Sequence, residues 1–316
     1  MPAQHWTLNA AGRWQTEGGR SISFRDNLVA GTYRPSAATT GTLGSLTTHA
    51  GDFVTTSASQ VVQNLNITGR VKIRHDNVTF RNCRIQGGNP TVEAGFCSVE
   101  AFQSRGTTTK FYDCEITTSY LQIESGNSIQ GRDFEIYRCN LWGSVDGVGA
   151  QYSNVTISAC WIHDIKWYTP DPGHSDNRTH NDGIQVHGGA NFTIIGNSIE
   201  VGYPGGGDGV GFHEHTSGIM VTQDVGATSN VTIDKNWIYS VSNVGTAVGI
   251  NLSHSPRSGP YGGTVTVTNN RFSALSTFRT GKHILMDSTT YDKATKPGNV
   301  IDASGVAATS SRHSGA

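Results

Sequence analysis

The stretch Phe111-Tyr-Asp-Cys114-Glu-Ile116 places a cysteine between two large apolar residues, and close variants of it recur along the chain. The shared pattern is apolar-x-x-(Cys or Asn)-x-apolar, with leucine once at the middle position. The other copies are Val62-Gln-Asn-Leu65-Asn-Ile67, Phe80-Arg-Asn-Cys83-Arg-Ile85, Ile136-Tyr-Arg-Cys139-Asn-Leu141, Ile157-Ser-Ala-Cys160-Trp-Ile162, Ile194-Ile-Gly-Asn197-Ser-Ile199, Ile233-Asp-Lys-Asn236-Trp-Ile238 and Val267-Thr-Asn-Asn270-Arg-Phe272. Eight copies of one short pattern predict a strand that recurs in a repeat protein.

The spacing of the copies is uneven, since 18 residues separate Leu65 from Cys83 and 39 separate Asn197 from Asn236. A constant motif at uneven intervals predicts constant rungs joined by loops of variable length. Rungs stacked about 4.8 Å apart would place each middle residue over the next one. We therefore expect an internal Cys/Asn ladder, which needs neither disulfides nor a metal.

A second short strand is predicted between the copies. Its segments begin at or near Cys97, Ser128, Asp146, Asp182, Ser217, Val248 and His283. Two or three short strands per turn predict an all-β chain folded as a right-handed parallel β-helix, a solenoid, of about eight to nine rungs. Residues 1–55 lack the motif and are expected to form an N-terminal cap region. Residues 56–288 would form the parallel β-helix, and residues 289–316 a C-terminal closing segment and tail.

The composition agrees with this class and excludes others. The 316 residues include 39 glycines, and only 15% are charged, which suits a turn-rich β architecture. A formal net charge of −1 provides no field that would concentrate nucleic acid. No apolar run approaches the ~18 residues of a membrane helix, and the first thirty residues hold none that resembles a secretion signal. We therefore expect no membrane insertion and no export of the chain in this form.

The motifs resemble those of a known superfamily. The Asn-Val-Thr-Ile openings at Asn154 and Asn230, the Cys/Asn ladder and the Asp182-Gly-Ile strand resemble the pectate-lyase-like β-helix proteins, in their NosD-like, carbohydrate-binding branch. Residues 41–85, the segment Trp161-Ile-His-Asp164 and the segment from Thr179 to Gly188 resemble secreted actinobacterial β-helix proteins and minor tail proteins of actinobacteriophages. The resemblance implies a carbohydrate ligand, and the missing signal favours the phage version.

The longest loops are expected to mark the working face, because rungs need few residues and extra length usually serves binding. They lie between residues 166 and 181 and between 200 and 216. The catalytic candidates on or beside them are Asp146, Asp182, His187 and Asp208. The substrate-binding candidates are Trp142, Trp167, Tyr168, Arg178, His180, Gln185, His213, Glu214 and His215.

Asp146 and Asp182 precede equivalent apolar residues and should stack on adjacent rungs. Paired carboxyl groups suit glycoside hydrolysis, in which one group donates a proton while the other activates water or attacks. The alternative is structural, since Asp-Gly can be a turn in which the aspartate bonds backbone amides. Both interpretations stay open here.

Other chemistries receive weaker support from the sequence. A lyase would use Arg132, Arg178 or His187 as the base and Asp176, Asp182 or Asp208 around calcium, but no specific motif is found. His213 and His215 could form a metal pair without a third ligand at fixed spacing, so no metal site is assigned and a calcium or transition-metal ion is left open. Trp161 and Trp237 follow the ladder position and should point outward, where they could stack on sugar rings or pack under loops.

These features together predict a phage tail protein, of the minor tail or tailspike kind, that binds a polysaccharide of the host cell envelope; cleavage stays open. The first alternative is a secreted polysaccharide hydrolase or lyase, and the second is a structural tail module without a ligand. The expected partners are the host glycan, other tail proteins and further copies of the chain, including a homotrimer. The expected location is the virion tail, or the extracellular space in the alternative.

Overall fold

The computed structural model describes most of the chain and gives the backbone of three short strands near the N-terminus. The described ranges are residues 34–87, 97–102, 108–118, 126–166, 175, 177, 179–201, 216–239, 248–253, 259–273, 283–302 and 305–313. The N-terminal strands β1 (Trp6–Leu8), β2 (Trp14–Thr16) and β3 (Ser21–Ile22) form a small antiparallel sheet.

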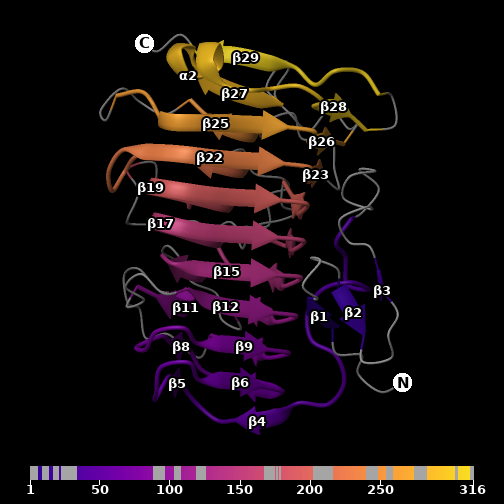
Figure 1. The fold of residues 1–316 in the computed structure, drawn as a ribbon, viewed down its shortest axis with the longest axis vertical. Helices are drawn as coiled ribbons and strands as arrows, with labels where there is room; N and C mark the ends of the chain where they lie inside the picture. Colours follow the sequence, from indigo (N-terminus) through magenta and orange to yellow (C-terminus); the bar gives the residue numbers. More distant parts are fainter. Residues whose placement is uncertain are drawn as a thin grey trace.

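One long parallel sheet holds ten strands of the described chain, stacked along the long axis of the molecule (Figure 1). In chain order they are β4 (Thr47–His49), β7 (Leu65–Ile67), β10 (Arg84–Ile85), β13 (Glu115–Thr117), β16 (Asn140–Trp142), β18 (Trp161–His163), β20 (Ser198–Glu200), β23 (Trp237–Tyr239), β26 (Arg271–Phe272) and β28 (Val300–Ile301). Spatial neighbours in this sheet follow each other in the same order as in the sequence. We call it the ten-stranded sheet.

The second long sheet consists of two parallel rows that merge in two long strands. One row contains β5 (Phe53–Val54), β8 (Val71–Lys72), β11 (Cys97–Ala101), β14 (Asn127–Gly131), β21 (Thr216–Val221), β24 (Val248–Leu252), β27 (Ile284–Asp287) and β29 (Ser310–His313). The other contains β6 (Val61–Gln63), β9 (Thr79–Arg81), β12 (Thr109–Tyr112), β15 (Phe134–Tyr137), β22 (Thr228–Asp234) and β25 (Gly262–Thr268). Strands β17 (Asp146–Ser158) and β19 (Asn181–Ile195) belong to both rows.

The chain enters the two long sheets in turn and returns each time one strand further along. The prediction of an all-β chain with parallel sheets is therefore confirmed, and the arrangement is compatible with a β-helix solenoid. Parallel pairing begins at β4 and ends at β29. The described helix α2 (Ser288–Lys293) is short, and none in the described ranges has the length and hydropathy of a membrane span.

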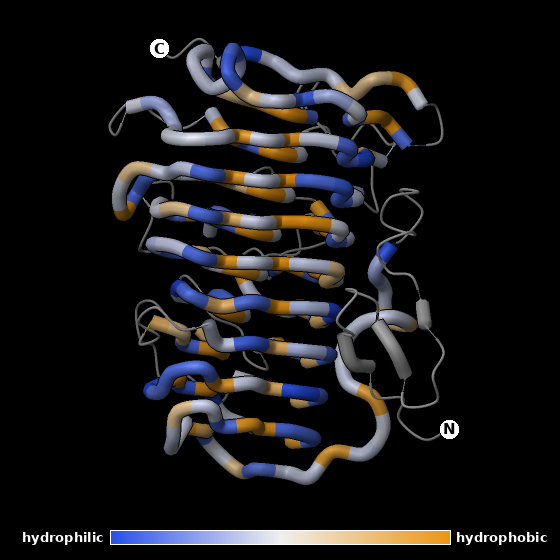
Figure 2. The backbone as a smooth tube through the Cα atoms, in the orientation of Figure 1, coloured by the Kyte–Doolittle hydropathy of each residue, from blue (hydrophilic) through white to orange (hydrophobic). Residues whose placement is uncertain are grey.

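Inward side chains of successive strands form apolar columns that run along the axis. Figure 2 shows that hydrophobic residues, in orange, recur along the backbone of successive strands. In the ten-stranded sheet, one column consists of Ile85, Ile116, Leu141, Ile162, Ile199, Ile238 and Phe272, all fully buried. Burying one such side chain contributes roughly 1.5–3 kcal/mol. These columns fix the register and so decide which residues meet on the outer face.

The recurring motif is a corner between two strands, so its interpretation as one strand was wrong. Its first apolar residue lies in the second sheet and its last lies in the ten-stranded sheet. The residue before each middle position has a left-handed backbone, for example φ 52° at Arg138 and 56° at Ala159. This conformation turns the chain sharply. Asn, Asp, Arg, Ala, Lys and Gly all occupy this position, so the sequence carried no single turn signal.

A row of buried amides runs along the axis at these corners. The side-chain nitrogen of Asn197 donates to Asn236 Oδ1 at 2.9 Å, that of Asn236 to Asn270 Oδ1 at 3.0 Å, and that of Asn270 to Asn299 Oδ1 at 3.0 Å. At the start of this row Cys160 N–H donates to Asn197 Oδ1. The five cysteines of the chain are buried and free, so none forms a disulfide.

Candidate functional site

Asp146 and Asp182, the predicted acid pair, lie at the starts of neighbouring strands β17 and β19 and are 5% and 3% exposed. Asp182 N–H donates to Asp146 Oδ1 at 2.8 Å, and Ser217 N–H donates to Asp182 Oδ1 at 3.0 Å. Burial, followed by the charge of Asp146, raises the pKa of Asp182 well above its usual value. This geometry favours the structural alternative, and the catalytic role stays a prediction.

The other described candidates are spread over different faces. His180 is exposed just before β19, and Gln185 lies half-buried within that strand. His187 Nδ1 lies 3.4 Å from Asp224 Oδ2. Trp142 lies on β16 of the ten-stranded sheet, and its indole N–H donates to Glu115 Oε1 at 3.1 Å. The structure therefore does not gather these residues around one point.

The remaining candidates lie outside the described residues. They are Asp208, Trp167, Tyr168, Arg178, His213, Glu214 and His215, together with Asp176.

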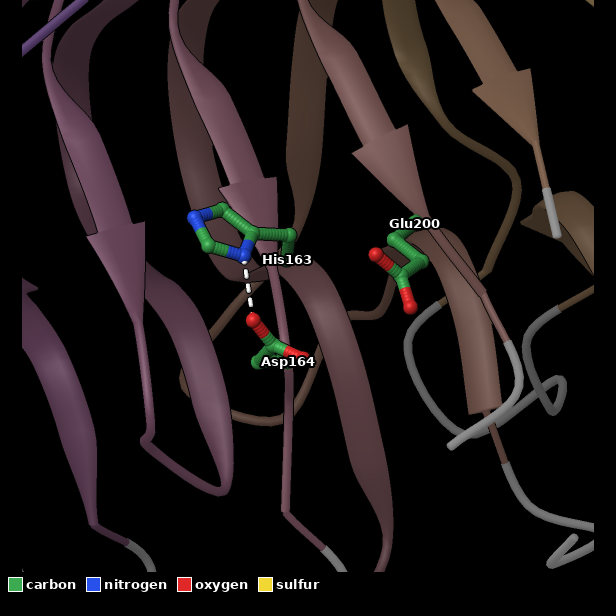
Figure 3. Close-up of side chains that lie close together, drawn as sticks. All are labelled: His163, Asp164 and Glu200. Carbon is green, nitrogen blue, oxygen red and sulfur yellow. Dashed lines mark hydrogen bonds and ion pairs between the residues drawn. The ribbon is translucent and has the colours of Figure 1, made fainter. Parts of the chain in front are cut away.

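A different cluster lies on the outer face of the ten-stranded sheet, formed by His163, Asp164 and Glu200 (Figure 3). His163 ends β18 and Glu200 ends β20, and the residues just before them, Ile162 and Ile199, are register partners. His163 Nδ1 lies 2.6 Å from Asp164 Oδ2. One donor atom from each of the three residues lies within 4.8 Å of the others. We call these three residues the His–Asp–Glu cluster.

The backbone of Asp164 explains how two consecutive residues can face each other. Its φ of 50° is left-handed, which an aspartate adopts more readily than most residues. The chain turns there and buries Ile165, which is 4% exposed. The carboxyl group of Asp164 can thus fold back toward the preceding imidazole while 53% of the side chain stays exposed.

Neighbouring side chains hold the cluster in place. Asn140 Oδ1 lies 2.8 Å from His163 Nε2, so both ring nitrogens face oxygen acceptors. Tyr239 O–H donates to Glu200 Oε2 at 3.3 Å, and Trp161 Nε1–H donates to the Tyr239 oxygen at 2.8 Å. Four adjacent strands, β16, β18, β20 and β23, therefore contribute side chains to two neighbouring hydrogen-bonded groups, one around His163 and Asp164 and one around Glu200.

The pKa values of the two carboxyl groups of the cluster are shifted in opposite directions. The hydrogen bond from His163 lowers the pKa of Asp164, with further help from Lys166, so this group is ionised at neutral pH. Burial, followed by the negative charge of Asp164, raises the pKa of Glu200 to about 7. Glu200 is only 9% exposed, which is why it retains its proton so well. Adjacent carboxyl groups with separated pKa values are the usual arrangement for an acid working beside a carboxylate.

The outward aromatic residues stack largely on each other. The Trp161 ring stacks on His163 with centroids 3.5 Å apart, and the Trp237 ring stacks on Tyr239 with centroids 4.2 Å apart. The Arg34 guanidinium lies 4.2 Å from the Trp237 centroid. Trp161 therefore supports His163 of the cluster, and Trp237 supports Tyr239, which donates to Glu200.

Two segments border the cluster along the coil. Residues 34–43 run beside the ten-stranded sheet, where Arg34 pairs with Asp302 at 2.5 Å and Gly41 N–H donates to Arg138 O at 3.0 Å. After Asp164, the chain is tied to the coil by the buried amide of Asn181, which donates to the carbonyls of Lys166 and Val145.

An imidazole and two carboxyl groups could also serve as ligands of a divalent cation. Here, however, both ring nitrogens of His163 are already hydrogen-bonded, so an ion would have to break the contact with Asp164. The described contacts suit proton handling better than ion binding.

Comparison of the chain with protein-family models, with curated proteins and with solved structures finds no match.

Sequence reasoning missed Glu200, Tyr239 and Asn140 as site residues. His163 and Asp164 entered only as part of a segment that resembles a family. The available signal was a charged residue three positions after Asn197, directly after the copy Ile194–Ile199, where the other copies place polar or aromatic side chains. Only the pairing of β18 with β20 brings Glu200 beside Asp164.

Proposed function

We propose that this protein binds a polysaccharide along the outer face of the ten-stranded sheet and hydrolyses it with Asp164 and Glu200. The observation that carries the proposal is the pair of carboxyl groups, which lie within 4.8 Å and have opposite pKa shifts. Glycoside hydrolysis generally uses two such groups, one protonated and one ionised.

Each group has the environment that its role requires. Glu200 is buried and holds a proton near neutral pH, so it can donate to the oxygen of the leaving sugar. Asp164 is half-exposed and ionised, so it can act on the sugar ring or on a water molecule. His163 touches Asp164 but is placed to orient that carboxylate, and we assign it a positioning role.

The surroundings suit a long ligand better than a small one. On the outer face of a sheet of parallel strands Asp164 is exposed, beside the buried His163 and Glu200, and Trp142 lies in register with His163 on the next strand. A polymer can lie across several strands of such a face, and aromatic side chains are frequent at sugar contacts.

The finer architecture and biological setting are part of the same proposal. We propose a right-handed parallel β-helix of the pectate-lyase-like superfamily, with about eight to nine rungs and the Cys/Asn ladder. We also propose that it is a phage tail component whose ligand is a glycan of the host envelope. The setting rests on the sequence resemblance, while the amide row supports the ladder.

The test is incubation of the purified chain with cell-envelope polysaccharides from actinobacterial hosts, with reducing ends measured over time. Wild-type protein should release reducing ends, and Glu200→Gln should lose roughly 10²–10⁴-fold of that rate. The matched control is Glu135→Gln, because Tyr137 O–H donates to Glu135 at 2.9 Å on the other sheet. This control should keep the wild-type rate.

Three other outcomes would overturn the hydrolase. New ultraviolet absorbance of an unsaturated uronate would indicate a lyase. Absence of cleavage across the panel, with binding retained, would leave a binding protein of the tail. Absence of both cleavage and binding would favour a structural module.

A further inference from the structure

The separation of the two carboxyl groups bears on how a glycosidic bond would be cleaved. Enzymes that invert the anomeric centre keep the groups about 6.5–9.5 Å apart, because a water molecule must fit beside the sugar. Enzymes that retain it place them about 5–5.5 Å apart, and one group attacks the sugar directly. In this protein one carboxyl oxygen of Asp164 lies within 4.8 Å of one carboxyl oxygen of Glu200, which is closer than the separation that an inverting enzyme keeps.

The hydrogen bonds distinguish the two oxygens of each group. Asp164 Oδ2 faces His163 Nδ1, Oδ1 makes no hydrogen bond with the described residues, and the side chain is 53% exposed. Glu200 Oε2 accepts the hydrogen bond from Tyr239, so the acid proton is expected on Oε1. One oxygen of Asp164 is therefore available to attack, and one oxygen of Glu200 is available to donate.

The positions of the groups support the same assignment. Glu200 is 9% exposed and held by Tyr239 and, through it, by Trp161. Asp164 stands at the exposed edge of the strand end, with its other oxygen oriented by an imidazole that Asn140 fixes in turn. An oriented, exposed carboxylate beside a buried acid suits a nucleophile beside an acid and base.

We propose that hydrolysis proceeds by double displacement with retention, with Asp164 as the nucleophile and Glu200 as the acid and base. This proposal rests on the proposed hydrolase. In the first step an Asp164 oxygen forms a bond to the anomeric carbon. The bond to the leaving oxygen breaks, and that oxygen receives the proton of Glu200.

The second step restores the protein. Glu200, now ionised, takes a proton from a water molecule, and the water oxygen bonds to the anomeric carbon. The ester bond to Asp164 breaks and returns its electron pair to the carboxylate. Atoms and charges balance without an oxidant, a reductant or a further reactant.

The test uses the envelope polysaccharide that the wild-type chain cleaves. Proton nuclear magnetic resonance of the first products should show the same anomer as the linkage of the polymer. With methanol added, mass spectrometry should show methyl glycosides, because methanol intercepts the glycosyl ester in place of water. Asp164→Asn should lose at least about a hundredfold in rate and form no methyl glycosides.

The outcomes separate this inference from the proposed function. Cleavage that yields the opposite anomer and no methyl glycoside would overturn double displacement and leave the hydrolase intact. Full activity of Asp164→Asn would overturn the nucleophile alone. A chain that cleaves no polysaccharide would overturn both proposals. Melting temperatures near that of wild type, and glycan binding by Asp164→Asn, show that the variant is folded.

Discussion

Glu200 illustrates how surroundings decide the chemistry of a single residue. Its carboxyl group is of the same kind as that of Glu115, which lies on β13 of the same sheet. Strands β16 and β18 lie between β13 and β20, so the two glutamates are not in contact. Glu200 differs in being buried beside the ionised Asp164, and these two effects raise its pKa to about 7. At neutral pH a substantial share of the Glu200 carboxyl groups therefore still carries a proton.

The pH dependence of cleavage follows from these two residues. Activity requires Glu200 protonated and Asp164 ionised, so the rate should fall as pH rises through about 7. On the acid side it should persist to below the usual pKa of an aspartate, because the pKa of Asp164 is lowered. The measurement is the initial rate of reducing-end release between about pH 3 and 9, so that the range extends well below and above the expected alkaline limit. A rate that keeps rising above pH 8, about one unit past the expected limit, would contradict the role of Glu200.

Tyr239→Phe tests the alkaline limit more finely. The hydrogen bond from Tyr239 lowers the pKa of Glu200, so its removal should raise that pKa and move the alkaline limb to higher pH. The control Tyr137→Phe removes the similar bond to Glu135 and should leave the profile in place. A purely structural role of Tyr239 would reduce the rate equally at every pH.

Asp182→Asn concerns stability rather than activity. The pKa of Asp182 is raised in the folded protein, so its contribution to stability is complete below the unfolded value of about 3.9 and is lost as pH rises through the folded pKa. An asparagine keeps the acceptor for Ser217 N–H and cannot ionise. The melting temperature of the variant should therefore gain on that of wild type as pH increases from about 4. A difference that is constant with pH would show that Asp182 does not titrate in this way.

At the scale of elements, the corner joins a strand of one sheet to a strand of the other. The left-handed residue provides the turn, and the amide row satisfies the backbone groups that the turn buries. For example, Asn236 Oδ1 accepts hydrogen bonds from both the backbone N–H and the side-chain amide of Asn197. The corner is therefore held by several bonds that cannot be made with water.

Asn236→Ala should remove this support. Two buried donors of Asn197 and the carbonyl of Ile194 would lose their partner, at a cost of roughly 1–3 kcal/mol for each group left unsatisfied. Asn66→Ala, on the half-buried outer side of β7, should cost less than about 1 kcal/mol. Chemical denaturation of the two variants compares them directly, and equal losses would contradict a special role of the row.

The elements also show what the sequence could and could not predict. The apolar columns repeat at fixed positions, so the parallel strands were predictable from residues such as Ile116 and Ile162. The corners were not, because residues as different as Arg138 and Ala159 adopt the same left-handed backbone. Glu200 lies 36 positions after Asp164 in the sequence, and the charge at position 200 does not by itself indicate that Asp164 is its neighbour. Their meeting depends on the register of β18 and β20, which the length of the intervening loop hides.

At the scale of the molecule, each rung contacts mainly the rungs before and after it. Stability in such a chain is close to a sum of rung terms and interface terms, so the ends should open before the middle. Strands β4, β5 and β6 pair on one side only among the described strands, as do β28 and β29. Hydrogen exchange should therefore be fastest at these strands and slowest around β17 and β19. Equal protection along the coil would indicate unfolding as a single unit.

The corner bonds are made identically across 39 residues between Asn197 and Asn236, 34 between Asn236 and Asn270, and 29 between Asn270 and Asn299. The length of chain between two corners is thus free to change without altering either corner. Insertions and substitutions between two corners therefore change the residues exposed there, while the neighbouring strands keep their pairing. Evolution can thus change the residues of individual loops, and with them the contacts that the protein makes, while the fold stays the same.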